Sequence, residues 1–172
     1  MKPRIRIRLA ALGAAALAST AAIGGATANA QQAEPQKNIV QTASDAGQFN
    51  TLIRLATRAG LGDALSGRGP LTVFAPTDRA FAKVPRATLR ALERNRRQLR
   101  AVLLYHVVRG NVRASQVVRL RRAKTLNGAN VRIGVRGNRV YLNRTTRVVT
   151  TDIGASNGTI HVINGVLIPP SH

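Results

Sequence analysis

The spacing of the apolar residues changes its period partway along the chain, and this change constrains the fold more than any other feature. Between Phe49 and Ala59 the apolar residues recur three and four positions apart, as they do on one face of an α-helix. Beyond Lys124 they alternate with polar residues, as at Val131 and Ile133, which is typical of strands with one buried face. Helical patterns that come first and strand patterns that come mostly later predict an α+β domain.

Prolines and capping residues divide the first half of the chain into further elements. Pro70 and Pro76 bound a compact apolar run, Leu71 to Ala75, which predicts a buried strand. Thr77 can cap a short helix after this strand, with Phe81 on its inner face. Two more helices are predicted, from Thr88 to Asn95 and from Arg96 to about Tyr105.

Turn dipeptides divide the second half of the chain into strands. Gly137-Asn138 is typical of a two-residue β-hairpin turn, and Asn157-Gly158 and Asn164-Gly165 mark further turns. No repeat and no second domain are evident, so we expect one domain over residues 37–170. The predicted strands run through Val131–Val135, Arg139–Leu142, Arg147–Ile153, Thr159–Ile163 and Val166–Ile168.

The first thirty residues have the pattern of a cleaved secretory signal peptide. Basic residues precede an Ala/Leu-rich run from Leu9 to Ile23, and the small residues Ala28 and Ala30 mark the expected cleavage site. This run is shorter than the roughly 20 apolar residues that span a bilayer, which disfavours the alternative of a membrane anchor. We therefore expect residues 1–30 to be removed, residues 31–36 to be a linker, and the mature protein to be soluble and extracellular or periplasmic.

The composition excludes several kinds of site. The 172 residues include 27 Lys and Arg, 6 Asp and Glu and no cysteine, which gives a formal charge of +21. Removal of residues 1–30 leaves +17, because four basic residues and no acidic residue precede position 31. Without cysteine the chain cannot form a disulfide, a thiolate metal site or a thiol nucleophile. A hydrophobic content of 44% argues against disorder and provides for a packed core.

Four stretches, in order along the mature chain, resemble the signature stretches of fasciclin domains. They are LTVFAPTDRAF (71–81), LLYHVVRG (103–110), KTLNG (124–128) and DIGASNGTIHVINGVLIPP (152–170). The resemblance implies a β-sandwich wedge with helices packed along it, and a role in cell adhesion or an extracellular matrix. One position departs from the family pattern. Asn164 stands where the family more often has Asp, which weakens any charge-dependent role there.

Tyr105 and His106 match the tyrosine–histidine pair to which the resemblance assigns adhesion in some fasciclin domains. His106 also continues the apolar helical face formed by Leu99, Val102 and Leu103. A histidine on such a face is more often a hydrogen-bonded core residue than a contact site. We therefore expect His106 to be structural, and the pair is kept as a candidate partner-binding site.

Catalytic and metal chemistry find little support in the sequence. The stretch Gly154–Gly158 satisfies the G-x-S-x-G pattern of serine hydrolases, but a strand rather than a helix is predicted after Ser156. His161 alternates with apolar neighbours in that strand, so we expect it to be structural and half-exposed. Histidines and carboxylates with metal-ligand spacing are missing, and no phosphate-binding or dinucleotide-binding loop occurs. We therefore predict no catalytic residue, no metal and no cofactor.

Basic residues cluster on the last predicted helices and shortly after them. Arginine presents paired donors that suit phosphate, sulfate and carboxylate groups, so these clusters favour binding of an anionic polymer. A genome rich in G and C would also favour arginine, and this alternative stays open. Few aromatic residues, 3% of the chain, disfavour nucleic acid as the dedicated partner. The candidate partner-binding arginines are Arg94, Arg96, Arg97, Arg100, Arg121 and Arg122.

These observations predict a secreted, single-domain, non-enzymatic adhesion or matrix-associated module. Its expected partner is a cell-surface or matrix component, either an anionic polysaccharide of the cell envelope or a protein, and its oligomeric state stays open. The first alternative is a carrier of a small apolar ligand, which would need an exposed apolar groove. The second alternative is a serine hydrolase built on Ser156.

Overall fold

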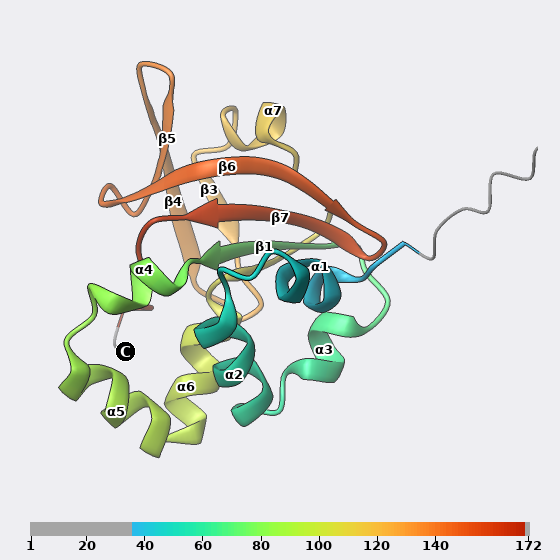
Figure 1. Ribbon diagram of the computed structural model, residues 1–172. Helices are drawn as coiled ribbons and strands as arrows, with labels where there is room; N and C mark the ends of the chain where they lie inside the picture. Colours follow the sequence, from blue (N-terminus) through green and yellow to red (C-terminus); the bar gives the residue numbers. More distant parts are fainter. Residues whose placement is uncertain (1–35, 171–172) are drawn as a thin grey trace, which may run out of the picture. The chain divides into compact units, whose positions relative to one another are not determined.

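The computed structural model describes residues 36–170. The predicted signal peptide and residues 31–35 of the predicted linker lie outside the described residues. The helices are α1 (Ile39–Asp45), α2 (Asn50–Arg58), α3 (Gly62–Ser66), α4 (Asp78–Ala82), α5 (Arg86–Arg94), α6 (Arg96–Leu104) and α7 (Ala114–Val117). The strands are β1 (Leu71–Pro76), β2 (Val107–Arg109), β3 (Arg122–Lys124), β4 (Asn130–Arg136), β5 (Arg139–Leu142), β6 (Thr146–Ala155) and β7 (Gly158–Ile163) (Figure 1).

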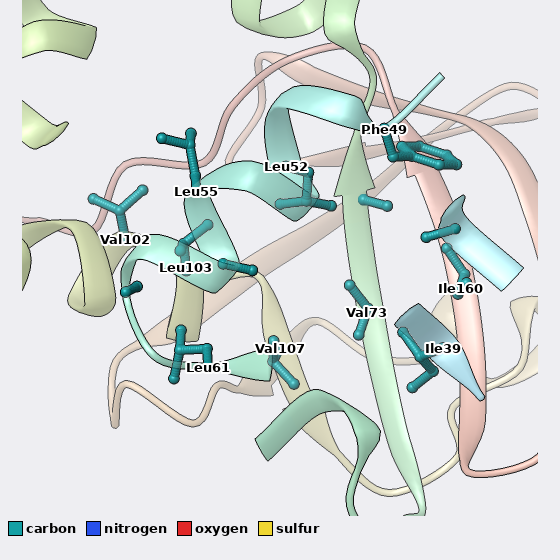
Figure 2. Close-up of a cluster of buried hydrophobic side chains, with 14 of the residues drawn as sticks. Ile39, Phe49, Leu52, Leu55, Leu61, Val73, Val102, Leu103, Val107 and Ile160 are labelled. Carbon is teal, nitrogen blue, oxygen red and sulfur yellow. The ribbon is translucent and has the colours of Figure 1, made fainter. Parts of the chain in front are cut away.

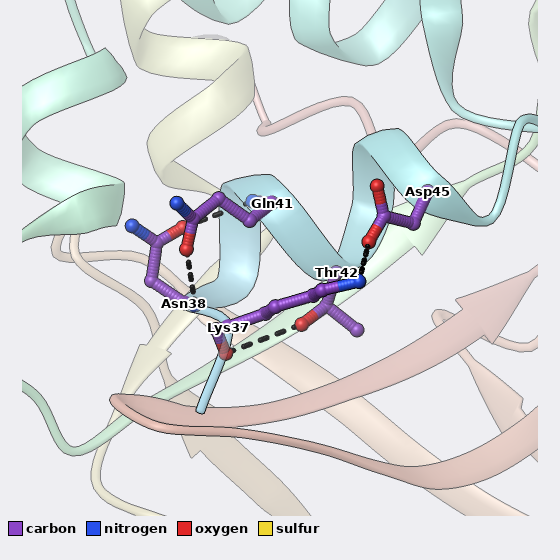
Figure 3. A network of polar contacts seen from close by, with 5 residues as sticks. All are labelled: Lys37, Asn38, Gln41, Thr42 and Asp45. Carbon is purple, nitrogen blue, oxygen red and sulfur yellow. Dashed lines mark hydrogen bonds and ion pairs between the residues drawn. The ribbon is translucent and has the colours of Figure 1, made fainter. Parts of the chain in front are cut away.

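The helix α1 is fixed by polar contacts at its start. Asn38 Oδ1 accepts a hydrogen bond from the Gln41 backbone N–H (2.9 Å), and Gln41 Oε1 accepts one from the Asn38 backbone N–H (3.0 Å). This capping box satisfies N–H groups that have no partner inside the helix. The Lys37 ammonium also pairs with the Asp45 carboxylate, and the Thr42 hydroxyl donates to the Lys37 carbonyl (3.3 Å; Figure 3).

The longer predicted helices are confirmed with small shifts at their ends. The pattern at residues 49–59 forms α2, and the two patterns after residue 86 form α5 and α6. Thr77 caps α4 as expected, because its hydroxyl oxygen accepts a hydrogen bond from the Ala80 backbone N–H (3.2 Å). The helices α1, α3 and α7 were not predicted, since seven, five and four residues are too few to display a helical period.

Seven strands form one mixed sheet in the order β2-β1-β7-β6-β5-β4-β3. The strands β1 and β7 are parallel, with Leu71 opposite Gly158, and the other neighbours are antiparallel. The two edge strands approach each other, because Val108 of β2 bridges to Thr125 and the Val107 carbonyl accepts from the Leu126 N–H (2.7 Å). The sheet therefore nearly closes on itself, and the α+β class is confirmed.

The buried side chains form two clusters that share β1. Alternation along β1 places Val73 and Ala75 in the first cluster and Phe74 in the second. The first cluster packs β1 and β7 against α1, α2 and α6, and Figure 2 shows its side chains meeting between helices and sheet. The second cluster includes buried residues of β4, β5 and β6. Because both faces of β1 are covered, the whole strand is buried, which agrees with its unbroken apolar run.

The predicted strand at Val166–Ile168 is wrong. The backbone there forms no strand, and the Leu167 N–H donates to His106 Nε2 (2.9 Å) instead of to a neighbouring strand. Prolines follow at positions 169 and 170 and offer no N–H group for a ladder. Three apolar residues in a row cannot specify a pairing partner, and here the His106 side chain accepts the hydrogen bond instead.

Candidate functional site

The arginines predicted on the helices form one exposed group, here called the helical cluster: Arg94, Arg96, Arg97 and Arg100. Arg94 ends α5, and the other three lie on the outer side of α6 because Leu99 and its apolar neighbours face the core. Asn95 separates the two helices and caps α6, since its Oδ1 accepts from the Gln98 N–H (3.1 Å). The helical cluster is therefore presented to solvent as the sequence predicts.

Arg96 differs from the rest of the helical cluster in its surroundings. A β-carbon built on Gly60 would lie 3.0 Å from a terminal nitrogen of Arg96, so the guanidinium rests against the turn that follows α2. Arg96 and Arg97 also occupy the first turn of α6, where the helix dipole disfavours positive charge. Replacement of Arg96 would therefore also remove a contact within the domain.

Arg121 and Arg122 belong to a different part of the domain. Arg122 begins β3 and Arg121 precedes it, and both side chains are exposed. The Arg121 carbonyl accepts a hydrogen bond from the Ile133 N–H (2.9 Å), which fixes this segment against β4. In Figure 1 the helices α5 and α6 lie on one side of β1, and β3 lies on the other. The structure therefore divides the predicted arginines into two groups.

Tyr105 lies in the interior, with 1% of its surface exposed. Its hydroxyl donates to the Asn130 carbonyl (3.1 Å) and accepts from Asn143 Nδ2 (3.0 Å). Asn143 adopts a positive φ of 49° in the turn between β5 and β6. The tyrosine therefore ties the end of α6 to the strand half of the domain.

His106 is also 1% exposed, and both of its ring nitrogens are hydrogen-bonded. Nδ1 is 2.8 Å from the Val102 carbonyl oxygen, which can only accept, so Nδ1 holds the proton and donates. Nε2 accepts from the Leu167 N–H (2.9 Å). Burial lowers the pKa of His106 from 6.5 to about 4, and the hydrogen bond to Val102 opposes this effect. The expectation of a hydrogen-bonded core histidine is confirmed.

The burial of Tyr105 and His106 limits how this pair could contact a partner. Their polar atoms all point to backbone or side-chain partners inside the domain. A direct contact would require the end of α6 to open. The role of the pair in partner binding stays a prediction, and its role in holding the two halves of the domain together is a feature of the fold.

The expected half-exposure of His161 is wrong, because the residue is 1% exposed. Its ring stacks on Phe74, with 5.6 Å between the ring centroids. Nε2 donates to the Val112 carbonyl (2.7 Å), and Nδ1 accepts from the Asp152 N–H (3.2 Å). The segment after β2 covers this face of β7, which a strand pattern alone cannot reveal.

The G-x-S-x-G stretch forms a hairpin turn. Ser156 lies between β6 and β7, and its backbone N–H donates to the Lys37 carbonyl (3.0 Å). A nucleophile elbow needs a helix after the serine, and β7 follows instead. Both ring nitrogens of His161 are already engaged, so it cannot serve as the base. The geometry therefore gives the hydrolase alternative no support.

Two hollows bear on the remaining alternatives. An apolar crevice of about 40 Å³ lies between α1, α2 and α3 above β1 and β7, which is far below the roughly 300–1,000 Å³ of small-molecule sites. A larger cleft of about 580 Å³ lies beside β2 and β3, and Arg109, Arg122 and Lys124 line it. Within residues 36–170 no three His, Asp or Glu side chains are grouped as metal ligands would be.

The sequence reasoning missed one set of basic residues. Arg132, Arg136 and Arg139 lie on the exposed face of the β4–β5 hairpin. The alternation at residues 131–136 already places the arginines on the other face of the strand from the apolar residues. The exposure of Arg132 and Arg136 could therefore have been predicted from the sequence. The two-residue turn Gly137-Asn138 also implies that Arg136 pairs with Arg139. What the sequence lacked was the register of β3, which sets Arg122 directly opposite Arg132.

Comparisons with known proteins agree with this architecture. The Fasciclin domain family model matches residues 47–169. Uncharacterized protein sll1735 of Synechocystis sp. is 41% identical over 131 residues, which cover 76% of this chain and 97% of that protein. Immunogenic protein MPB70 of Mycobacterium bovis is 37% identical over 130 residues, which cover 76% of this chain and 62% of that protein.

A solved structure shows the same fold. It is a FAS1 domain pair from the insect cell adhesion molecule Fasciclin I, with a TM-score of 0.64 and 16% identity, covering 77% of this chain and 51% of that chain. The chain belongs to the fasciclin domain family. Transforming growth factor-beta-induced protein ig-h3 of Sus scrofa is 32% identical over 134 residues, which cover 78% of this chain and 20% of that protein. Within residues 36–170 no helix has the length and apolar character needed to cross a membrane.

Proposed function

We propose that this chain is a secreted, non-enzymatic adhesion or matrix-associated module that binds anionic glycopolymers at the cell envelope. The fold supports the adhesive role, because the same fold occurs in a FAS1 domain pair from an insect cell adhesion molecule. The export pattern of residues 1–30 supports an extracellular or periplasmic location.

The observation that most supports an anionic partner is that acidic side chains of the described residues do not pair with most of the exposed arginines. Among residues 36–170 the side-chain ion pairs that form are Lys37–Asp45 and Arg54–Glu93. The helical cluster, Arg121 and Arg122 are exposed and take part in neither pair. An exposed guanidinium keeps its charge at any ordinary pH and matches carboxylate, sulfate and phosphate with two parallel donors.

The test is capture of the purified mature chain on immobilised dextran sulfate, with uncharged dextran of the same length as the matched control. Attraction between exposed charges weakens as the Debye length falls from about 30 Å at 0.01 M salt to about 8 Å at 0.15 M. We expect retention on the sulfated polymer that decreases over this range, and none on dextran. Equal retention on both polymers, or none on either, would contradict the proposal.

Location needs its own measurement. We expect intact-mass analysis of the protein exported by the producing cell to give a chain that begins at Gln31. A full-length chain found only in the cytoplasm would refute the export part of the proposal.

A further inference from the structure

We propose that the anionic polysaccharide binds along the outer face of β3, β4 and β5, and continues into the cleft beside β2. The inference rests on the proposed function and assigns its site. The strand face is defined here by Arg122, Arg132, Arg136 and Arg139, and the cleft by Arg109 and Lys124 together with Arg122.

The strand register places the arginines of the strand face on one side of the sheet. Arg122 lies directly opposite Arg132, and Arg136 lies directly opposite Arg139. Arg132 and Arg136 are four residues apart on β4, so they share a face and are separated by about 14 Å. The positive positions therefore form a row that is longer than a single sugar residue.

Like charges directly opposite each other in a sheet are destabilising, and no carboxylate on these strands offsets them here. The strands β2, β3, β4 and β5 contain no acidic residue. The acidic residue of β6, Asp152, accepts a hydrogen bond from the Ala114 N–H (2.9 Å). An anionic chain laid across the face would remove this repulsion, so binding and folding stability are coupled at this surface.

The shape of the strand face favours an extended ligand. Gly134 lies between Arg132 and Arg136, and a β-carbon built on it would meet nothing within 4 Å. At one end of the face, Arg122 also lines the cleft of about 580 Å³ beside β2, where apolar residues such as Val108 and Leu120 accompany the cations. Sugar rings present apolar C–H surfaces and charged substituents together, which suits such a lining.

Single-stranded nucleic acid fits this face less well than a polysaccharide. Binding of bases depends on exposed aromatic rings on which they stack. The strand face offers Tyr141, whose ring is already covered by the Arg136 guanidinium, 5.5 Å from the ring centroid. An uncovered stacking platform is therefore missing from the described part of this face.

Two variants with equal net charge separate a located site from general attraction. The strand variant replaces Arg132, Arg136 and Arg139 by Gln. The helical variant replaces Arg94, Arg97 and Arg100 by Gln and spares Arg96, which contacts Gly60. Both lose three charges, so long-range attraction to a polyanion falls equally in both.

Binding of a defined-length oligogalacturonate and of dextran sulfate should be measured at 0.15 M salt by calorimetry. We expect the strand variant to bind at least about tenfold more weakly than the parent, which corresponds to about 1.4 kcal/mol, and the helical variant to lose about threefold or less. Without polymer, the strand variant should melt at or above the parent temperature, because removal of opposed charges relieves repulsion. With polymer, the parent and the helical variant should gain melting temperature, and the strand variant should gain less.

The other outcomes overturn this inference. Equal losses in the two variants would mean that net charge alone attracts the polymer, and a larger loss in the helical variant would place the site on α5 and α6. Tighter binding of a single-stranded DNA oligomer that the strand variant also loses would replace the polysaccharide by nucleic acid. If the parent binds neither polysaccharide, the proposed function itself fails.

Discussion

Acidification should weaken the fold through His106. The buried imidazole donates through Nδ1 to Val102 and accepts through Nε2 from Leu167. A second proton would remove that acceptor and place a charge in the core, and burial therefore lowers the pKa of His106 to about 4. In the unfolded chain the same group titrates near 6.5.

The sign and size of the effect follow from these two values. Between pH 6.5 and 4 the histidine is protonated in the unfolded chain but stays neutral in the folded chain. The contribution of neutral His106 to the free energy of unfolding is therefore complete above pH 6.5 and is lost as the pH falls towards 4. The difference corresponds to about 3 kcal/mol of unfolding free energy.

The carboxyl of Asp78 affects stability at a lower pH than His106 does. Burial opposes its ionisation, but hydrogen bonds from Thr51 and Asn50 outweigh this and lower its pKa below 3.8, so its contribution is lost only in stronger acid.

Urea denaturation at several pH values between 7 and 4.5 measures the loss, and a His106→Gln variant is the control. The variant should be less stable at neutral pH by about 1–3 kcal/mol, because its side chain cannot reproduce both hydrogen bonds, and its stability should depend less on pH over this range. An NMR titration of the parent gives a second measurement that needs no variant. A His106 imidazole that titrates near 6.5 in the folded protein, or a variant with the parent's full pH dependence, would refute the reasoning.

Two further predictions concern the turn between β6 and β7. Replacement of Gly158 by Ala should cost about 3 kcal/mol or more in a denaturant melt, because the new β-carbon would lie 1.8 Å from the Leu71 carbonyl oxygen. The matched control is Gly154→Ala, whose β-carbon meets nothing within 4 Å and whose cost should stay within about 0.5 kcal/mol; similar losses in both would contradict the steric argument. Replacement of Asn157 by Asp should cost at least about 2 kcal/mol at neutral pH, because its Nδ2 donates to two carbonyl oxygens, both at 2.8 Å, that a carboxylate would repel. An unchanged midpoint for this isosteric variant would show that the contacts contribute nothing.

The sequence was informative wherever a pattern repeats over many residues. The helical period at residues 49–59 and the alternation after residue 130 specified α2 and β4 without knowledge of any partner, because burial of one face depends only on the local period. The Gly137-Asn138 pair likewise specified the turn of the β4–β5 hairpin. The family resemblance supplied the order of these elements along the chain.

The candidate site depended on contacts that no local pattern contains. His161 is buried because the segment near Val112 covers it, and Val166–Ile168 is not a strand because His106 takes the hydrogen bond of Leu167. Composition and charge runs determined that this chain is strongly basic and which helix presents part of that charge. Only the tertiary structure decided that Arg122 stands opposite Arg132, because the register of β3 against β4 is set by hydrogen bonds between two strands whose connection does not by itself specify the pairing.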